Sequence, residues 1–205
     1  GLAFSLLGML LMAPPISYSI YSLVSGKDDG VSSDQREELF IYEQVPWAKK
    51  HFEEFSALPT TYYDFITWRR DDFAGETINI VDGIRTTIGS QAQNSKKEHY
   101  YFFGGSTTWG TGVNDANTYP SLFAQKANGS VTNLGETAYI ARQSLAYLNN
   151  YIINNSIDDM SRKHVVFYDG VNDVFHRCRS EISGLATGRE SQIQNRLSQP
   201  TKLSR

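Results

Sequence analysis

The chain is 205 residues long, and 40% of its residues are hydrophobic and 13% aromatic. This length is typical of one to one and a half domains, and the composition supplies a sizeable core and excludes a globally disordered chain. The 19 Lys and Arg against 22 Asp and Glu give a net charge of −3, which provides no general attraction to nucleic acid. The single cysteine, Cys178, excludes an internal disulfide bond and a cysteine-cluster metal site.

Residues 1–26 carry no charged side chain and are mostly apolar. About 20 apolar residues are enough for a helix to cross a bilayer, and such a helix tolerates a kink such as Pro14-Pro15. A signal-peptide core and a buried helix are the alternatives, but the segment lacks a basic start and a clear cleavage site. We therefore predict a membrane anchor over residues 1–26. The flank Lys27-Asp28-Asp29 is not basic, which favours a chain that lies outside the cytoplasm.

Residues 27–98 are predicted to form an extension that precedes the main domain. A linker rich in Gly, Ser and Asp leads to a helix that is capped by Ser33 or Asp34 and runs to about Gln44. Pro46 interrupts this pattern. A second helix is then indicated by residues at helical spacing that pack on the domain: Trp47, His51, Phe55 and Leu58.

The rest of the extension is predicted to contain a hairpin and a loop. Asp82-Gly83 lies between two β-prone runs in residues 77–88, a pattern typical of a β-hairpin. Residues 91–98 are polar, and we expect a loop there. On the helical stripe before the hairpin, we interpret His51 as a packed histidine rather than a metal ligand.

Residues 99–205 are predicted to form the main domain. Three segments in it are predicted to be strands: residues 99–103, 130–134 and 164–168. The first is a continuous apolar run, which is typical of a strand buried on both faces of a parallel sheet, the second is short, and the third is also expected to be buried. A helix capped by Thr118, with Pro120 in its first turn, separates the first two segments and ends near Asn128-Gly129. A second helix separates the last two segments and carries its apolar residues at Ala141, Leu145, Leu148 and Ile152.

The order strand, helix, strand, helix, strand predicts right-handed crossovers and an α/β fold class. We expect a three-layer α/β/α sandwich with a parallel sheet, preceded by an N-terminal transmembrane helix and the helix and hairpin extension. Residues 179–205 are polar, and three core strands make a thin sheet. We therefore expect the natural protein to continue beyond Arg205 and to supply more strands.

Ligands of a parallel α/β sheet bind beyond the carboxyl ends of its strands. The three predicted strands are followed at that end by Ser106, Gly135 and Asn172 in turn. The pair Gly104-Gly105 lets the chain turn sharply before Ser106. A serine hydroxyl acts as a nucleophile when a base takes its proton, and the oxyanion that forms needs fixed donors about 3 Å away. We predict Ser106 as the nucleophile, with the N–H groups of Ser106 and Gly135 and the amide of Asn172 as donors.

Other kinds of site have no support in the sequence. It contains no phosphate-binding loop, no dinucleotide-binding glycine turn and no His/Glu pair at zinc spacing, so we predict neither a cofactor nor a metal. Trp109 and Tyr119 lie near Ser106, where either stacking on a sugar or core packing suits them. His99 and His164 begin predicted strands, which puts them at the end of the sheet opposite to the predicted site.

Three blocks of the chain resemble the SGNH (GDSL-type) hydrolase family: residues 103–110 (FGGSTTWG), 133–135 (NLG) and 170–173 (GVND). The resemblance covers about residues 99–175, and residues 62–88 are similar to the extension of membrane-anchored bacterial members. It implies a three-layer α/β/α fold and an esterase or O-acyltransferase that acts on ester-linked acyl groups, often acetyl on carbohydrate. It also implies Ser106 as nucleophile and Gly135 and Asn172 in the oxyanion hole, in a domain that faces the periplasm or the cell exterior.

The family's fourth block is Asp-x-x-His, which supplies the base and its orienting acid. The only match in the chain is Asp173 with His176, which overlaps the third block, and we interpret it as a coincidence. The base is then expected beyond Arg205, and residues 1–205 alone are expected to show traces of esterase activity at most. The alternative is a non-catalytic module that keeps the scaffold to bind polysaccharide or a partner protein. The expected partners are an acylated small molecule or carbohydrate and the membrane, and not nucleic acid.

Overall fold

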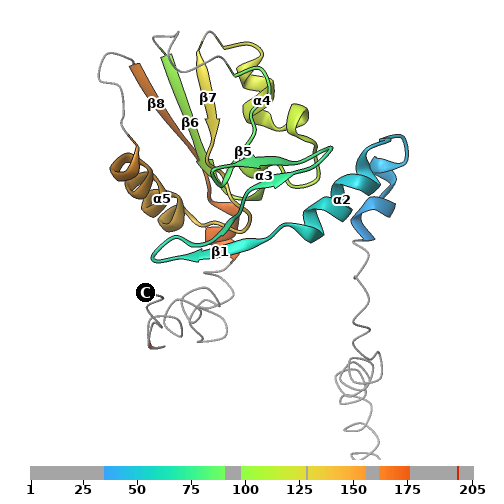
Figure 1. Cartoon of the computed structure of the whole chain (residues 1–205), viewed down its shortest axis with the longest axis horizontal. Coiled ribbons are helices and arrows are strands. Elements are labelled where there is room, and N and C mark those ends of the chain that lie inside the picture. Colours follow the sequence, from blue (N-terminus) through green and yellow to red (C-terminus); the bar gives the residue numbers. More distant parts are fainter. Residues whose placement is uncertain (1–34, 91–97, 128, 156–161, 176–197, 199–205) are drawn as a thin grey trace, which may run out of the picture. The chain divides into compact units, whose positions relative to one another are not determined.

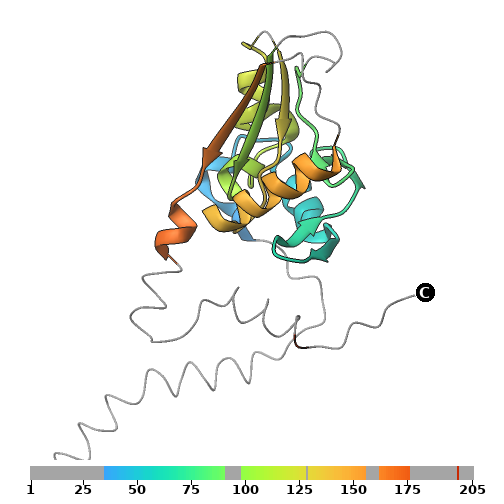
Figure 2. The same ribbon diagram turned by 90° about the vertical axis from the view of Figure 1, so that its left-hand side faces the viewer.

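The computed structural model describes residues 35–90, 98–127, 129–155, 162–175 and 198. The chain divides into two units after Gln35, and the fold is that of the second unit, from Arg36 onwards. Its centre is a six-stranded sheet, which Figures 1 and 2 show from two directions. A separate two-stranded hairpin crosses the lower end of this sheet in Figure 1.

The order of strands across the main sheet is β3-β4-β5-β7-β6-β8. Their bounds are β3 (Phe73–Ala74), β4 (Asn79–Val81), β5 (Ile84–Arg85), β6 (Glu98–Gly104), β7 (Ser130–Asn133) and β8 (Arg162–Tyr168). Strand β6 pairs in parallel with β7 on one side and β8 on the other, and the remaining neighbours are antiparallel. Phe102 is paired with Asn133, and Gly104 with Tyr168. The loops that follow β6, β7 and β8 therefore leave the sheet at the same edge.

Helices cover both faces of the central parallel strand β6. Residues 171–175 are helical, and the other helical elements are η1 (Gln35–Glu38), η2 (Phe40–Tyr42), α2 (Ala48–Ala57), α3 (Ser106–Trp109), η4 (Asp115–Asn117), α4 (Tyr119–Ala124) and α5 (Ala141–Asn154). On one face, Tyr147 of α5 packs in a cluster with Tyr101 and Phe103 of β6. On the other face, Ala124 of α4 packs in a cluster with Phe102. Because successive strand residues point to opposite faces, β6 is apolar on both.

The separate hairpin consists of β1 (Thr60–Tyr63) and β2 (Thr67–Arg70). It lies at the edge of the sheet where the parallel strands end (Figure 1). Two hydrogen bonds attach it there: Gln143 Nε2 donates to Ile66 O at 3.0 Å, and Tyr139 Oη donates to Trp68 O at 3.2 Å. The hairpin thus borders the loops that follow β6, β7 and β8.

The predicted fold class is wrong. The sheet is mixed rather than parallel, because β5 pairs antiparallel with β7 through Arg85 and Asn133. The predicted hairpin of residues 77–88 therefore belongs to the main sheet, between β3 and β7, instead of preceding it. In the part of the chain that the structure describes, no helix has the length and apolar character needed to cross a bilayer, so the described fold contains no transmembrane helix. Residues 1–26 lie outside that part.

Most of the predicted local elements are present, with different ends. The strands β6, β7 and β8 and the helix α5 lie where the apolar patterns place them. Thr118 caps α4, since its hydroxyl accepts a hydrogen bond from Ser121 N at 3.3 Å, although α4 ends at Ala124 rather than near Asn128. The turn between β4 and β5 has positive φ at Asp82 (53°) and Gly83 (68°), as a type I′ hairpin requires.

The first expected helix differs from the structure. Instead of one helix that runs to Gln44, the chain forms the short 3-10 helices η1 and η2. They are separated at Leu39, whose ψ of 138° is extended. The second expected helix is α2, on which His51 is fully buried between aromatic rings.

Candidate functional site

Ser106 is the first residue of α3, directly after β6. Its backbone carbonyl accepts hydrogen bonds from Gly110 N at 2.8 Å and Thr111 N at 2.9 Å, which close the short helix and the turn that follows it. Gly104, two residues before Ser106, has no room for a side chain, because a Cβ there would lie 2.4 Å from Tyr168 O. The sharp turn predicted from Gly104-Gly105 is therefore present, and it leaves Ser106 partly exposed.

Ser106 lines a pocket of about 150 Å³ at the carboxyl edge of the sheet. The other residues of this Ser106 pocket follow β6 and β8 or belong to the loop before α5: Gly105, Thr107, Tyr139, Tyr168, Asp169, Gly170, Val171 and Asn172. This volume holds a short acyl group and is smaller than the pockets that enclose drug-sized ligands. The structure thus brings Ser106 and Asn172 to one cavity, although they follow different strands.

Asn172 is held over the backbone of Gly105. Its Nδ2 donates to Tyr139 O at 2.8 Å, and a Cβ on Gly105 would lie 2.7 Å from that same nitrogen. Only glycine at position 105 allows this approach. An amide nitrogen carries two hydrogens, so one donor of Asn172 remains for a ligand in the pocket.

Gly135 has a different environment. Its N–H donates to Asn133 Oδ1 at 3.1 Å, and a Cβ on it would lie 2.5 Å from Trp109 N. Gly135 therefore packs against the backbone of α3, and it is not among the described residues that line the Ser106 pocket. Its role as an oxyanion donor stays a prediction, and it requires the contact with Asn133 to open.

Asp169 also lines the pocket, although it is not among the residues predicted for the site. It directly follows β8, and its Oδ1 accepts a hydrogen bond from Ser144 Oγ at 3.1 Å. Its Oδ2 is buried and has no hydrogen-bond partner among the described residues. Burial raises the pKa of Asp169 above its ordinary value against the hydrogen bond from Ser144, and the charge of Asp173 adds to the rise. The available signal was a carboxylate placed immediately after the third apolar run.

The two partners of the Asp-x-x-His spacing are not both described. Both carboxylate oxygens of Asp173 lie 3.1 Å from Ala141 N, so Asp173 accepts a hydrogen bond from the first turn of α5 and stabilises that end of the helix. His176 lies outside the described residues. The histidines that are described, His51, His99 and His164, do not line the Ser106 pocket.

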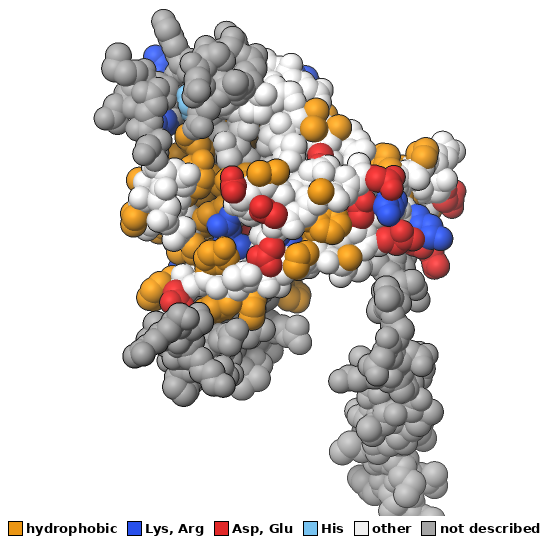
Figure 3. Space-filling model, in the orientation of Figure 1, with side chains coloured by type: hydrophobic (Ala, Val, Ile, Leu, Met, Phe, Trp, Pro, Cys, Tyr) orange, Lys and Arg blue, Asp and Glu red, His pale blue; other side chains and the backbone are white. Residues whose placement is uncertain are grey.

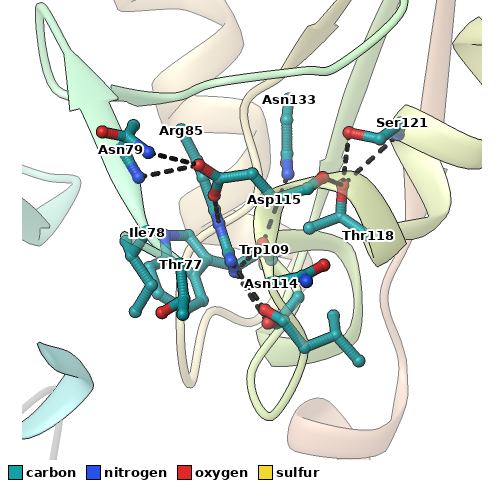
Figure 4. Close-up of polar contacts among 12 residues, drawn as sticks. Thr77, Ile78, Asn79, Arg85, Trp109, Asn114, Asp115, Thr118, Ser121 and Asn133 are labelled. Atoms are coloured by element: carbon teal, nitrogen blue, oxygen red, sulfur yellow. Dashed lines mark hydrogen bonds and ion pairs between the residues drawn. The ribbon is translucent and has the colours of Figure 1, made fainter. Parts of the chain in front are cut away.

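The far end of α3 is held by a buried arginine (Figure 4). Arg85 Nη1 donates to Trp109 O at 3.0 Å and to Gly110 O at 2.7 Å, and its Nη2 donates to Val113 O at 2.7 Å. Its Nε pairs with Asp115 Oδ1 at 2.9 Å. Burial lowers the pKa of Arg85, and Asp115 opposes that effect. We call this group the Arg85 network, and it fixes the position of the helix that carries Ser106.

Two further predictions concern Trp109 and metal binding. Trp109 is 2% exposed and packs in the core with Ile78 and Ile80, so it offers no free ring face to a sugar. Within the described ranges, no group of three or more His, Cys, Asp or Glu residues is arranged to hold a metal ion.

Comparisons of the chain with protein-family models and with curated proteins each found no match.

Proposed function

We propose that the Ser106 pocket is the acyl-transfer centre of a serine ester hydrolase or O-acyltransferase. The observation that supports this most directly is the convergence of Ser106, Asn172 and Asp169 on one small cavity. The three residues supply a nucleophile, a hydrogen-bond donor and a proton acceptor. The resemblance of residues 103–110 and 170–173 to blocks of the SGNH family supports the same chemistry. The cavity volume of about 150 Å³ favours a short acyl group such as acetyl.

In the proposed reaction, Ser106 Oγ attacks the carbonyl carbon of the ester while its proton passes to Asp169. The carbonyl oxygen becomes an oxyanion and accepts hydrogen bonds from the free Asn172 N–H and the Ser106 backbone N–H. The C–O bond to the alcohol then breaks, and the alcohol leaves with the proton from Asp169. The product is an acyl-enzyme on Ser106. Water completes hydrolysis, and a sugar hydroxyl completes transfer.

Asp169 suits the role of proton acceptor for two reasons. One of its oxygens has no described hydrogen-bond partner, and Asp169 lines the same pocket as Ser106. Its pKa is raised by burial, which brings its basicity closer to the working pH and makes proton transfer easier.

The proposal is tested with p-nitrophenyl acetate, an activated acetyl ester. We expect release of p-nitrophenolate together with an acetyl group on the peptide that contains Ser106. Ser106→Ala should abolish both, whereas Thr107→Ala removes the neighbouring hydroxyl in the same pocket and should retain the acetylated peptide. Equal release by the parent chain and the folded Ser106→Ala variant would contradict the proposal.

The alternative is a non-catalytic module that binds polysaccharide or a partner protein. It is favoured by the lining of the Ser106 pocket, which contains no histidine among the described residues. This alternative predicts that a folded chain never becomes acetylated on Ser106. The same experiment therefore separates the two functions.

A further inference from the structure

A second pocket lies at the β1–β2 hairpin. Its volume is about 300 Å³, and it is lined by Thr60, Trp68, Arg70 and Thr137. We call it the Trp68 pocket. It shares one loop with the Ser106 pocket, because Thr137 lines the former and Tyr139 lines the latter.

Glu136 holds two walls of the Trp68 pocket in place. Its Oε1 accepts hydrogen bonds from Thr137 N at 2.7 Å and Thr137 Oγ1 at 3.1 Å, and its Oε2 accepts one from Arg70 N at 2.9 Å. The Glu136 N–H donates to Gly104 O at 3.0 Å, which ties these walls to the end of β6. Gly104 lies only two positions before Ser106. The walls are therefore pre-organised, and they are fixed to the same strand end as the proposed nucleophile.

Trp68 supplies the flat wall of this pocket. It is half-buried, and its ring meets the ring of Tyr62 on the paired strand at 5.3 Å and 71°. Its carbonyl accepts the hydrogen bond from Tyr139 Oη at 3.2 Å. These contacts fix both the backbone and the ring, so the indole is a rigid surface with little conformational freedom to lose when a ligand binds.

Arg70 supplies a donor that no described residue uses. Its side chain is 13% exposed, and its guanidinium carbon lies 5.2 Å from the centre of the Phe55 ring and 5.5 Å from that of Trp109. Arg70 Nε is buried and has no hydrogen-bond partner among the described residues, an arrangement that costs free energy. Its charge is countered by Glu136 Oε1, 3.6 Å from Nη1. This ion pair leaves the pocket without a strong preference for an anion.

We propose that the Trp68 pocket binds a saccharide ring. The C–H face of a sugar is flat and apolar and suits the indole. Its hydroxyl groups both donate and accept, which matches the hydroxyls of Thr60 and Thr137 that line the pocket. If the proposed function is right, this ring belongs to the alcohol part of the ester, and its acyl group enters the Ser106 pocket along the shared loop.

The first test compares two acetyl esters on the full chain, methyl 6-O-acetyl-β-D-glucopyranoside and p-nitrophenyl acetate. The measured quantity is the ratio of their kcat/KM values. Trp68→Ala should lower this ratio about tenfold through the KM of the sugar ester, the effect of losing about 1.4 kcal/mol of binding. Trp68→Phe keeps a ring beside Tyr62 and should lower it less. The control Phe65→Ala removes an exposed aromatic side chain of the same hairpin and should leave the ratio unchanged.

The second test does not depend on catalysis. Methyl β-D-glucopyranoside is titrated into the Ser106→Ala chain, and we expect saturable binding that Trp68→Ala in the same background weakens about tenfold. If neither ester is hydrolysed but this binding is observed, the proposed function fails and the saccharide site stands. A ratio that Trp68→Ala leaves unchanged overturns the saccharide site while the ester chemistry stands. Absence of saturable binding by the sugar also overturns it.

Discussion

The two ends of α3 meet two different kinds of polar environment. At its C-terminal end, Arg85 makes four hydrogen bonds, one to Asp115 and three to backbone carbonyls. At its N-terminal end, the Ser106 pocket is lined by Asp169, which has a buried carboxylate oxygen without a described partner, and by Asn172, whose amide nitrogen donates only one described hydrogen bond. Satisfied networks make a structure rigid, and buried polar groups that stay unsatisfied need another explanation, such as a ligand.

Two carboxylates show the same contrast. Glu54 accepts hydrogen bonds from the backbone N–H groups of Glu76, Thr77 and Ile78 and from the Thr77 hydroxyl. Burial raises its pKa, but these hydrogen bonds outweigh burial and lower the pKa of Glu54 overall. Asp169 has the opposite balance, and its pKa is raised. The first carboxylate stabilises the fold as an anion, whereas the second is poised to accept a proton.

The largest expected effect comes from breaking the Arg85 network. Arg85→Ala leaves Asp115 buried without its cation and frees three carbonyls around α3, so we expect a loss of about 3–5 kcal/mol in the free energy of unfolding. The control Lys50→Ala removes an exposed ion pair with Glu76 (3.7 Å) and should cost no more than about 1 kcal/mol. Urea denaturation measures both. Equal midpoints for the two variants would contradict the role given to Arg85.

The next largest effect is expected on turnover, from a change in the Ser106 pocket. Asn172→Ala removes the free oxyanion donor, so turnover of p-nitrophenyl acetate should fall about 10²–10³-fold. The unfolding midpoint should change little, because the variant loses only one described hydrogen bond, to Tyr139 O. The two quantities are measured on the same preparation. A variant that is less stable but whose folded fraction keeps full activity would show that Asn172 only shapes the turn.

The smallest effect is the opposite pH dependence of the two carboxylates. Because the pKa of Asp169 is raised in the folded chain, the free energy of unfolding falls as the pH rises from the ordinary Asp pKa to the folded pKa. Asp169→Asn should therefore be more stable than the parent chain above this range of pH and equally stable in stronger acid. A lowered folded pKa means the reverse for Glu54. Glu54→Gln should therefore be less stable than the parent near neutral pH, and the difference should shrink as pH falls through the folded pKa.

Thermal unfolding of both variants between pH 3 and pH 8, spanning the ordinary carboxylate range, measures these differences. Asp169→Asn should also lose turnover while it gains stability, since an amide cannot take the proton from Ser106. The same pH trend in both variants would contradict the distinction between the satisfied and the open carboxylate.

Local signals explain which parts of the fold were predictable. The apolar run that became β6, the capping residue Thr118 and the turn Asp82-Gly83 each depend on a few neighbouring residues. The pairing of β5 with β7 was missed because it depends on Arg85 and Asn133, which are far apart in the sequence. Since this pairing decides whether the sheet is mixed or parallel, the fold class was wrong although the local elements were present.

The β1–β2 hairpin was missed for a different reason. It has positive φ at Phe65 (65°) in the turn and at Thr67 (82°), the first residue of β2, and these residue types rarely adopt this conformation. No glycine marks the turn, so the sequence carries no hairpin signal there. Consequently the Trp68 pocket could not be predicted, since the hairpin brings Trp68 and Arg70 to the loop of Thr137.

The candidate site was only partly predictable. Ser106 and Asn172 were expected to meet because they follow parallel strands, and they line one pocket. Asp169 could not be predicted, because what marks it is a buried carboxylate oxygen without a hydrogen-bond partner among the described residues. That property depends on how the folded chain packs and not on the spacing of residues in the sequence. For the same reason, the contact of Gly135 with Asn133 could not be anticipated.

The most direct test of the acyl-transfer centre at Ser106 is to map where a fluorophosphonate probe reacts with the folded chain. If the open groups around Ser106 form an acyl-transfer centre, the label should lie on the peptide that contains Ser106. It should be lost in Ser106→Ala and be absent from the buried, hydrogen-bonded Ser121 and Ser144. A folded chain that takes up no label, or a Ser106→Ala variant that is labelled as strongly as the parent, would contradict the account.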